Sequence, residues 1–120
     1  MLQTAPDRES KNQTSAEEID ELYCSACGHL VTRARWRLSR KGDHQHTVFN
    51  PAGRLFRIVC FSDAPGAAPE GTPSDEFTWF PGYKWLIAIC RNCGRHMGWQ
   101  FVGGDIFFAL IKSHLTDKKH

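Results

Sequence analysis

Two pairs of cysteines share a spacing that suits metal binding. Cys24 and Cys27 enclose two residues and precede a glycine, and Cys90 and Cys93 repeat the same C-x-x-C-G pattern. A tight turn lets both thiolates of a pair face one ion, and glycine tolerates the left-handed conformation that closes such a turn. Four thiolates complete a tetrahedral zinc shell and leave no position for substrate. The pattern therefore predicts one structural Zn²⁺ ion.

The long separation of the two pairs, by residues 28–89, does not argue against a shared ion. The entropic cost of closing a loop grows only with the logarithm of its length. Zinc binding contributes roughly 10–16 kcal/mol in small zinc domains, which exceeds that cost. The alternative is two independent, redox-active pairs. The fifth cysteine, Cys60, lies in an apolar run and is expected to be buried in the core.

Three tryptophans flank the second cysteine pair. The chain reverses at that pair and can bring the strand with Trp85 beside the strand with Trp99. Trp79 joins them only if the connection over residues 80–84 is wider than a two-residue hairpin, which would leave Trp85 on the opposite face. Two interpretations stay open from the residues alone. The three indoles form either a box for a small ring or cation, or part of an aromatic core.

Short strands must position these side chains. Apolar runs rich in β-branched and aromatic residues, separated by turn residues, predict a mainly β domain. Residues 105–115 leave helix and strand open, because the apolar spacing there is nearly helical. The predicted strands cover residues 30–38, 47–49, 55–61, 77–79, 84–89 and 97–102.

The connections and the N-terminus also carry predictions. Asn50–Gly53 suits a type I turn and Phe80–Tyr83 a type II turn. Residues 62–76 are rich in proline, glycine and acid, which predicts a long surface loop able to act as a lid. Ser15–Glu18 has the pattern of a capping box for a short helix toward Leu22. Residues 1–20 are otherwise polar and predict a disordered segment before a folded domain over 21–120.

Composition narrows the partners and the compartment. The 15 basic and 13 acidic residues give a formal charge of +2, which provides no reason to expect nucleic-acid binding. The apolar runs are far shorter than the roughly 20 residues that span a membrane, and the N-terminus lacks an apolar secretory signal. We therefore expect a cytoplasmic protein. In that reducing compartment, metal ligation is a more natural role for cysteines than disulfides.

The aromatic string ahead of the second cysteine pair resembles the thalidomide-binding domain of cereblon, called the CULT domain. The resemblance covers about residues 23–115, and the short chain is similar to the single-domain bacterial members of that family. It implies a β-tent fold, in which a structural zinc pins two antiparallel sheets set at a large angle. The motifs that carry it are Cys24-x-x-Cys27, Asn50-Pro51-x-Gly53, W-F-P-G-Y-K-W at 79–85, Cys90-x-x-Cys93 and H-M-G-W-Q-F at 96–101.

The resemblance also implies a binding site. Trp79, Trp85 and Trp99 would form a cage, with Phe101 as its floor. In the family, such a cage holds the glutarimide ring of thalidomide-type drugs, related cyclic imides and, more weakly, uridine-like compounds. A modified protein terminus that carries a cyclic imide, acting as a degron, is a partner of the same chemistry.

The polar contacts of this site are likewise implied by the resemblance. The backbones of Phe77 and Trp79 would provide an acceptor and a donor for the imide, because an unpaired polar group costs about 1–3 kcal/mol when buried. Asn50 would contact the substituent outside the cage. Phe77 stands where animal cereblon has histidine, so only a backbone role carries over.

Several properties of the family are not expected here. The Lon-like domain and the helical module that binds a ubiquitin-ligase adaptor are missing, so a ligase role does not transfer. We expect a non-enzymatic binding module. One alternative is a reader of quaternary ammonium or methyl-lysine through cation–π attraction, with Asp75 and Glu76 nearby. Another is a thiol oxidoreductase related to methionine sulfoxide reductase, but no cysteine follows Cys93 and Cys60 has no evident activating base.

Overall fold

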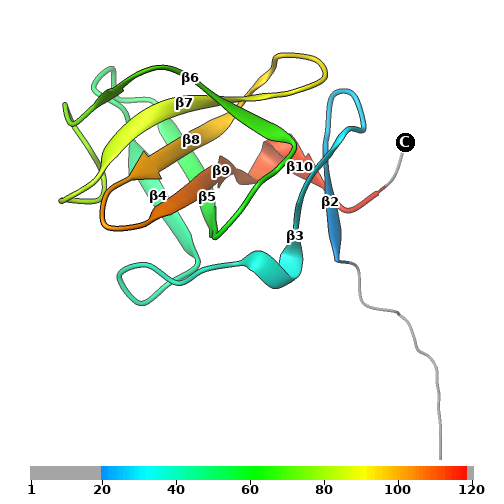
Figure 1. Cartoon of the computed structure of the whole chain (residues 1–120), viewed down its shortest axis with the longest axis horizontal. Helices are drawn as coiled ribbons and strands as arrows, with labels where there is room; N and C mark the ends of the chain where they lie inside the picture. The colour runs from blue at the N-terminus through cyan, green and yellow to red at the C-terminus, as the bar shows by residue number, and fades with distance from the viewer. Residues whose placement is uncertain (1–19, 119–120) are drawn as a thin grey trace, which may run out of the picture.

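The strands within residues 20–118 form two antiparallel sheets, which confirms the predicted mainly β fold (Figure 1). The computed structural model describes residues 20–118. The smaller sheet has the strand order β10–β2–β3, and the larger has the order β4–β5–β9–β8–β7–β6. In chain order the elements are β2 Glu21–Cys24, β3 Leu30–Arg33, the 3-10 helix η1 Ala34–Trp36, β4 Gln45–Phe49, β5 Leu55–Phe61, β6 Ala67–Ser74, β7 Lys84–Cys90, β8 His96–Val102, β9 Ile106–Ile111, the 3-10 helix η2 Lys112–His114 and β10 Leu115–Thr116.

Strand β9 crosses the middle of the larger sheet, and this position explains why its sequence left helix and strand open. It pairs with β5 on one side and β8 on the other. Phe108 and Leu110 belong to the buried cluster shared with the smaller sheet, whereas Phe107, Ala109 and Ile111 belong to a second buried cluster. Because both faces are covered, apolar residues follow one another without the alternation of a half-exposed strand.

The predicted surface loop over residues 62–76 is wrong, because most of it is strand β6. Among the described strands it pairs with β7 alone, and it forms an edge of the larger sheet. An edge strand tolerates proline, and Pro69 lies opposite Ala88 in the ladder. The register shifts between Glu70 and Ser74, where Gly71 has a φ of 83°. The turn-forming residues mark a bulged edge rather than a lid.

Two other strand predictions need correction. Residues 77–79 lie in the irregular connection between β6 and β7, and Phe77 has a φ of 55°, which strand backbone does not allow. Residues 34–36 turn into η1 instead of continuing β3. The predicted helix toward Leu22 is also wrong at its described end, because Leu22 pairs with Thr32 in the smaller sheet. Its start at residues 15–18 lies outside the described part of the chain, as does the predicted disordered segment up to residue 19.

The two predicted turns are confirmed by their hydrogen bonds. The Gly53 N–H donates to the Asn50 carbonyl at 2.8 Å and joins β4 to β5. The Tyr83 N–H donates to the Phe80 carbonyl at 3.0 Å, and Gly82 has the positive φ, 92°, that a type II turn requires at its third residue. The second turn leads into β7 and sets the path of the connection that carries Trp79.

Gly98 in β8 allows a close approach of β8 to β9. Its φ is 154°, and a Cβ at this position would lie 2.2 Å from the Ala109 carbonyl oxygen. No side chain fits in that space without moving backbone atoms. Trp99 follows Gly98 directly and lies opposite Ala109 in the same ladder.

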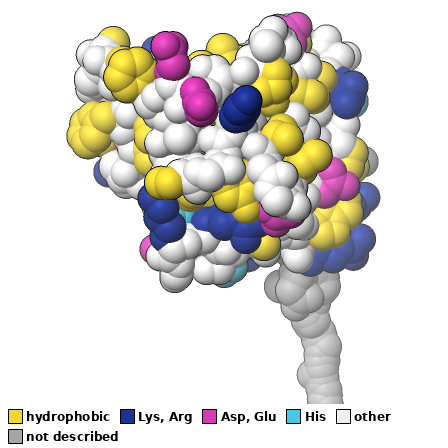
Figure 2. Space-filling view, turned by 60° about the vertical axis from the view of Figure 1, so that its left-hand side comes forward, with side chains coloured by type: hydrophobic (Ala, Val, Ile, Leu, Met, Phe, Trp, Pro, Cys, Tyr) yellow, Lys and Arg dark blue, Asp and Glu magenta, His cyan; other side chains and the backbone are white. Residues whose placement is uncertain are grey.

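Figure 2 shows basic side chains gathered mainly across the lower part of the face that it presents. Hydrophobic side chains lie there among basic and acidic ones. Among residues 20–118, no helix is long and apolar enough to cross a membrane.

Candidate metal centre and aromatic pocket

The structure brings the four predicted cysteines of the two C-x-x-C pairs into one cluster. Their sulfur atoms all lie within 4.8 Å of one another. The Sγ atoms of Cys24 and Cys93 are 3.8 Å apart, and those of Cys27 and Cys90 are 3.6 Å apart. A tetrahedral zinc with bonds of ~2.3 Å sets its sulfur ligands about 3.8 Å apart, whereas a disulfide needs about 2.05 Å. The cluster has the dimensions of a four-thiolate metal site.

The two cysteine pairs lie in two separate turns that have the same local structure. The Gly28 N–H donates to the Cys24 carbonyl at 2.8 Å, and the Gly94 N–H donates to the Cys90 carbonyl at 2.9 Å. The two glycines have φ values of 80° and 78°. The repeated sequence C-x-x-C-G therefore produces the same left-handed closure twice, as predicted.

The cluster lies where the two sheets meet. Cys24 ends β2 in the smaller sheet, and Cys90 ends β7 in the larger one. Figure 1 shows the connection between β7 and β8 beside the hairpin of β2 and β3. A metal ion bound by all four sulfurs would cross-link the sheets at this point.

The thiols of the cluster differ in their readiness to ionise. Hydrogen bonds from the Asn92 side chain and the His29 backbone lower the pKa of Cys27 to about 6. Burial raises the pKa of Cys90 to about 11. A thiolate at Cys90 therefore needs a neighbouring positive charge, and a bound divalent cation is a group that supplies it.

Cys60 lies apart from this cluster. Its side chain is fully buried in the second apolar cluster, as predicted. Burial raises its pKa to about 11, which disfavours the nucleophilic thiolate.

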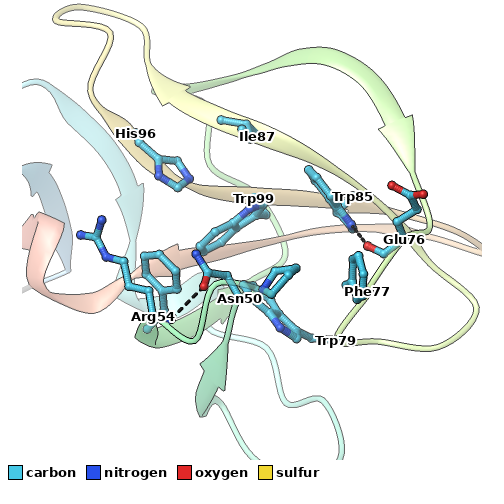
Figure 3. A pocket seen from close by; sticks show the side chains of 11 residues that line it. Asn50, Arg54, Glu76, Phe77, Trp79, Trp85, Ile87, His96 and Trp99 are labelled. Carbon is cyan, nitrogen blue, oxygen red and sulfur yellow. Dashed lines mark hydrogen bonds between the residues drawn. The ribbon is translucent and has the colours of Figure 1, made fainter.

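A pocket of about 330 Å³ opens on the larger sheet and contains the three predicted tryptophans (Figure 3). Its volume is at the small end of the range for small-molecule sites, about 300–1,000 Å³. It is lined by Asn50, Pro51, Arg54, Phe56, Glu76, Phe77, Trp79, Trp85, Ile87, His96 and Trp99.

The indoles reach the pocket from two different kinds of element. Trp85 on β7 and Trp99 on β8 project from paired strands, while Trp79 comes from the connection before β7. The rings of Trp79 and Trp99 are 4.7 Å apart between centroids and stand at 83° to each other. They form two adjoining walls, and Trp85 faces the pocket from further along the sheet (Figure 3). Residues 80–83 form a tight turn and not the wider loop predicted for convergence. The indoles still converge, because Trp79 lies in the irregular connection between β6 and β7, and Lys84 pairs with Val102 instead of Trp79.

Hydrogen bonds fix the orientation of two indoles. The Trp79 Nε1–H donates to the Phe49 carbonyl at 2.9 Å, and the Trp85 Nε1–H donates to the Glu76 carbonyl at 2.8 Å. Lys41 holds the same connection from outside, because its Nζ donates to the Trp79 carbonyl at 2.9 Å. Residues far apart in the sequence thus support one tryptophan.

Phe101 lies behind the pocket and does not line it. Its side chain is fully buried, stacks on Phe107 at 5.2 Å and has its ring 6.4 Å from Trp79. The predicted floor is therefore a supporting layer in this structure. The apolar surface beside Trp99 comes instead from Phe56, whose ring lies 5.1 Å away.

Phe77 and Asn50, the other predicted ligand residues, both lie at the pocket. Phe77 has 73 % of its surface exposed and stands at the rim. Asn50 accepts a hydrogen bond from the Arg54 N–H at 2.8 Å. Its place in the turn after β4 lets its side chain face the pocket (Figure 3).

Sequence reasoning missed several lining residues, among them His96, Phe56 and Arg54. The His96 ring lies 4.8 Å from that of Trp99, and its Nε2 lies 3.0 Å from the Gly98 carbonyl. Burial is the main cause that lowers the pKa of His96, which favours a neutral ring. The alternation of β5 places Phe56 on the same face as Ile58. No residue near Phe56 in the sequence indicates that this face lies against the tryptophans.

Comparison with known proteins gives one consistent result. No protein-family model matches this chain. Curated relatives named Protein cereblon do match: that of Drosophila virilis is 47% identical over 114 residues, covering 83% of this chain and 17% of the relative. That of Drosophila persimilis is 55% identical over 106 residues (77% of this chain, 16% of the relative), and that of Gallus gallus is 48% identical over 75 residues (58% and 17%). The chain spans about a sixth of the length of these relatives.

Proposed function

Because this chain carries a domain of the cereblon family, we propose that it is a non-enzymatic binding module for cyclic imides. The ligand ring enters between Trp79, Trp85 and Trp99. Its methylene groups pack on the indole faces, and its imide group meets the backbone at the rim. The partner is a small cyclic imide or a protein terminus that carries one, and uridine-like compounds bind more weakly.

One observation carries this proposal: the rim offers an unpaired acceptor beside an unpaired donor. Neither the Phe77 carbonyl nor the Trp79 N–H has a hydrogen-bond partner within residues 20–118. An imide presents an N–H directly next to a carbonyl, so one ligand edge satisfies both groups. The positive φ of Phe77, 55°, is a costly backbone conformation, and such strain is common where backbone groups are held for a ligand.

The four-cysteine cluster supports the same proposal as a structural zinc centre. Four thiolates close the coordination shell, so the ion acts on stability rather than on a substrate. Reduced cysteines are required, which favours the cytoplasm. The matched segment covers only about a sixth of the length of these relatives, and binding of a ubiquitin-ligase adaptor is not part of the proposal.

The test is a titration of the full chain with glutarimide, followed by tryptophan fluorescence, with N-methylglutarimide as the matched ligand. We expect glutarimide to bind and the methylated ring to bind at least about tenfold more weakly, because it leaves the rim acceptor unpaired. Equal affinities would show that the imide N–H is not recognised, and no response to either ring would overturn the proposal.

A second candidate function is recognition of a quaternary ammonium group. Glu76 lines the pocket, and its carboxylate forms no ion pair with any described residue. A cation among three indoles would gain cation–π attraction as well. Trimethyl-lysine in the same titration separates the two, since tighter binding of the ammonium than of glutarimide would replace the imide assignment.

An oxidoreductase that uses Cys60 is less well supported. The thiol is fully buried, and its raised pKa, about 11, keeps it protonated at neutral pH. Thiol-dependent turnover of methionine sulfoxide that disappears in Cys60→Ser would establish that activity.

A further inference from the structure

We propose that the pocket continues into an oxyanion subsite formed by Arg54 and Asn50, so that the natural ligand carries a carboxylate or phosphate on its substituent. This inference rests on the proposed imide function, because it concerns the part of the ligand outside the indoles. The three indole rings offer no positive charge to a carboxylate or phosphate, so recognition of that group needs other residues.

The pocket has two ends that differ in charge. In Figure 3, Arg54 and His96 lie at one end, Glu76 and Phe77 lie at the other, and Trp99 lies between them. A ring held at the rim beside Phe77 therefore directs its substituent either to solvent or along the pocket toward Arg54. The apolar side of that path is Phe56, which is buried.

The Arg54 guanidinium is held in place but not neutralised. It lies 5.1 Å from the centroid of the Phe56 ring, where cation–π attraction favours it. Its side chain has no hydrogen bond or ion pair with any residue of the described range. Two backbone bonds fix the residue itself: the Arg54 N–H donates to Asn50 Oδ1 at 2.8 Å, and the Asn50 N–H donates to the Arg54 carbonyl at 3.0 Å.

Asn50 adds neutral donors next to this charge. Because its Oδ1 already accepts from the Arg54 N–H, its NH₂ group is the end left for a ligand. That NH₂ group has no partner within residues 20–118. An amide donor beside a guanidinium is a set that suits an oxyanion, which only accepts hydrogen bonds.

The charge at the other end makes the arrangement directional. Glu76 repels an anion from the Phe77 end and leaves Arg54 as the cation that lines the pocket. An anionic substituent is thus favoured in one orientation and disfavoured in the reverse one. A quaternary ammonium ligand would show the opposite preference: Arg54 repels its charge and Glu76 attracts it.

The expected gain is modest because Arg54 is exposed. An exposed ion pair contributes up to about 1 kcal/mol, which corresponds to about a fivefold gain in affinity. Salt should reduce that gain, because it screens an exposed charge.

The test uses the full chain and three ligands that share one ring: 3-aminoglutarimide acylated with acetate, with succinate or with phosphonoacetate. We expect the two anionic ligands to bind about fivefold more tightly than the acetyl ligand at low salt. The larger of the two gains identifies carboxylate or phosphate as the preferred group. In Arg54→Gln the ratio of anionic to acetyl affinity should fall to about one, while Arg54→Lys should keep part of it.

Arg57→Gln is the matched control, because Arg57 is also an exposed arginine of this segment but lines a separate hollow with Lys112. It should keep the full ratio. A ratio near one in the unmodified chain, or a ratio that Arg54→Gln leaves intact, overturns the subsite while the imide assignment stands. Failure of all three ligands to bind overturns the proposed function and the subsite together.

Discussion

The cysteine cluster and the aromatic pocket share one hairpin but are built in different ways. Strand β7 carries Trp85 near its start and Cys90 at its end, and β8 carries Trp99 at its middle. Each cysteine pair is shaped by a turn that closes within a few residues. The pocket instead needs side chains from separate segments to converge. Local backbone motifs define one site, and long-range support defines the other.

Trp79 illustrates that long-range support. Its indole donates to Phe49, 30 residues away, and its carbonyl accepts from Lys41, 38 residues away. Its ring also stands against Trp99 at 4.7 Å. None of these contacts follows from the residues next to Trp79. The comparison predicts that changes at the cluster affect the whole domain, whereas changes at the pocket affect mainly the ligand.

The largest effect should follow Cys90→Ser. Losing one of four sulfurs should release the metal, lower the free energy of unfolding by more than about 4 kcal/mol and weaken imide binding as well, because the pocket shares the hairpin. Urea unfolding and zinc analysis by mass spectrometry measure the first two effects. Cys60→Ala is the control: it also removes a buried thiol, but zinc content should be unchanged. Full zinc content and unchanged unfolding in Cys90→Ser would contradict the ligand assignment.

Trp85→Ala should separate the two sites. Among the described residues its ring contacts no other aromatic ring, whereas Trp99 is buried and contacts Trp79, Phe56 and His96. Removing Trp85 should therefore weaken glutarimide binding by at least about tenfold at a small cost in stability, because the ligand loses one apolar wall.

Isothermal titration and zinc analysis test this prediction together. Trp36→Ala is a suitable control, since Trp36 is also half-buried but lies between Arg33 and Arg35, away from the pocket. It should lower stability and leave imide binding intact. Unaltered binding in Trp85→Ala would exclude that indole from the site.

The contrast between the sites also explains what the sequence could predict. The repeated C-x-x-C-G pattern specified the turn and the ligand type, and the fold had only to bring two copies together. The strands around Phe56 and Trp85 were recognisable from apolar runs with turns at their ends. Strand β6 was missed because Pro69 and Gly71 argue for a loop unless one knows that the strand lies at a sheet edge.

Pocket residues were harder to predict because their roles depend on register. Phe101 carried the same aromatic signal as Trp99, yet it packs on Phe107 beneath the site. Arg54 resembled any exposed arginine until its turn placed it beside the pocket. Which aromatic residue lines a cavity and which supports it is decided by contacts between strands that a single sequence does not reveal.

Lys41→Met should give the smallest effect and is the most direct test of long-range support. The ammonium is exposed, and its bond to the Trp79 carbonyl is worth up to about 1 kcal/mol. Methionine keeps much of the apolar stem but cannot donate, so the connection that carries Trp79 should become less well held. Glutarimide affinity should fall about two- to threefold, with little change in urea unfolding.

Lys112→Met provides the matched control, because that lysine also donates across the fold, to Gln45 at 3.1 Å, but away from the indoles. It should leave glutarimide affinity unchanged. An unchanged affinity in Lys41→Met would mean that the Phe49 bond and the ring contact with Trp99 are sufficient to position Trp79. In that case the pocket would depend on its own aromatic contacts, and the difference between the two sites would be smaller than the hydrogen bonds suggest.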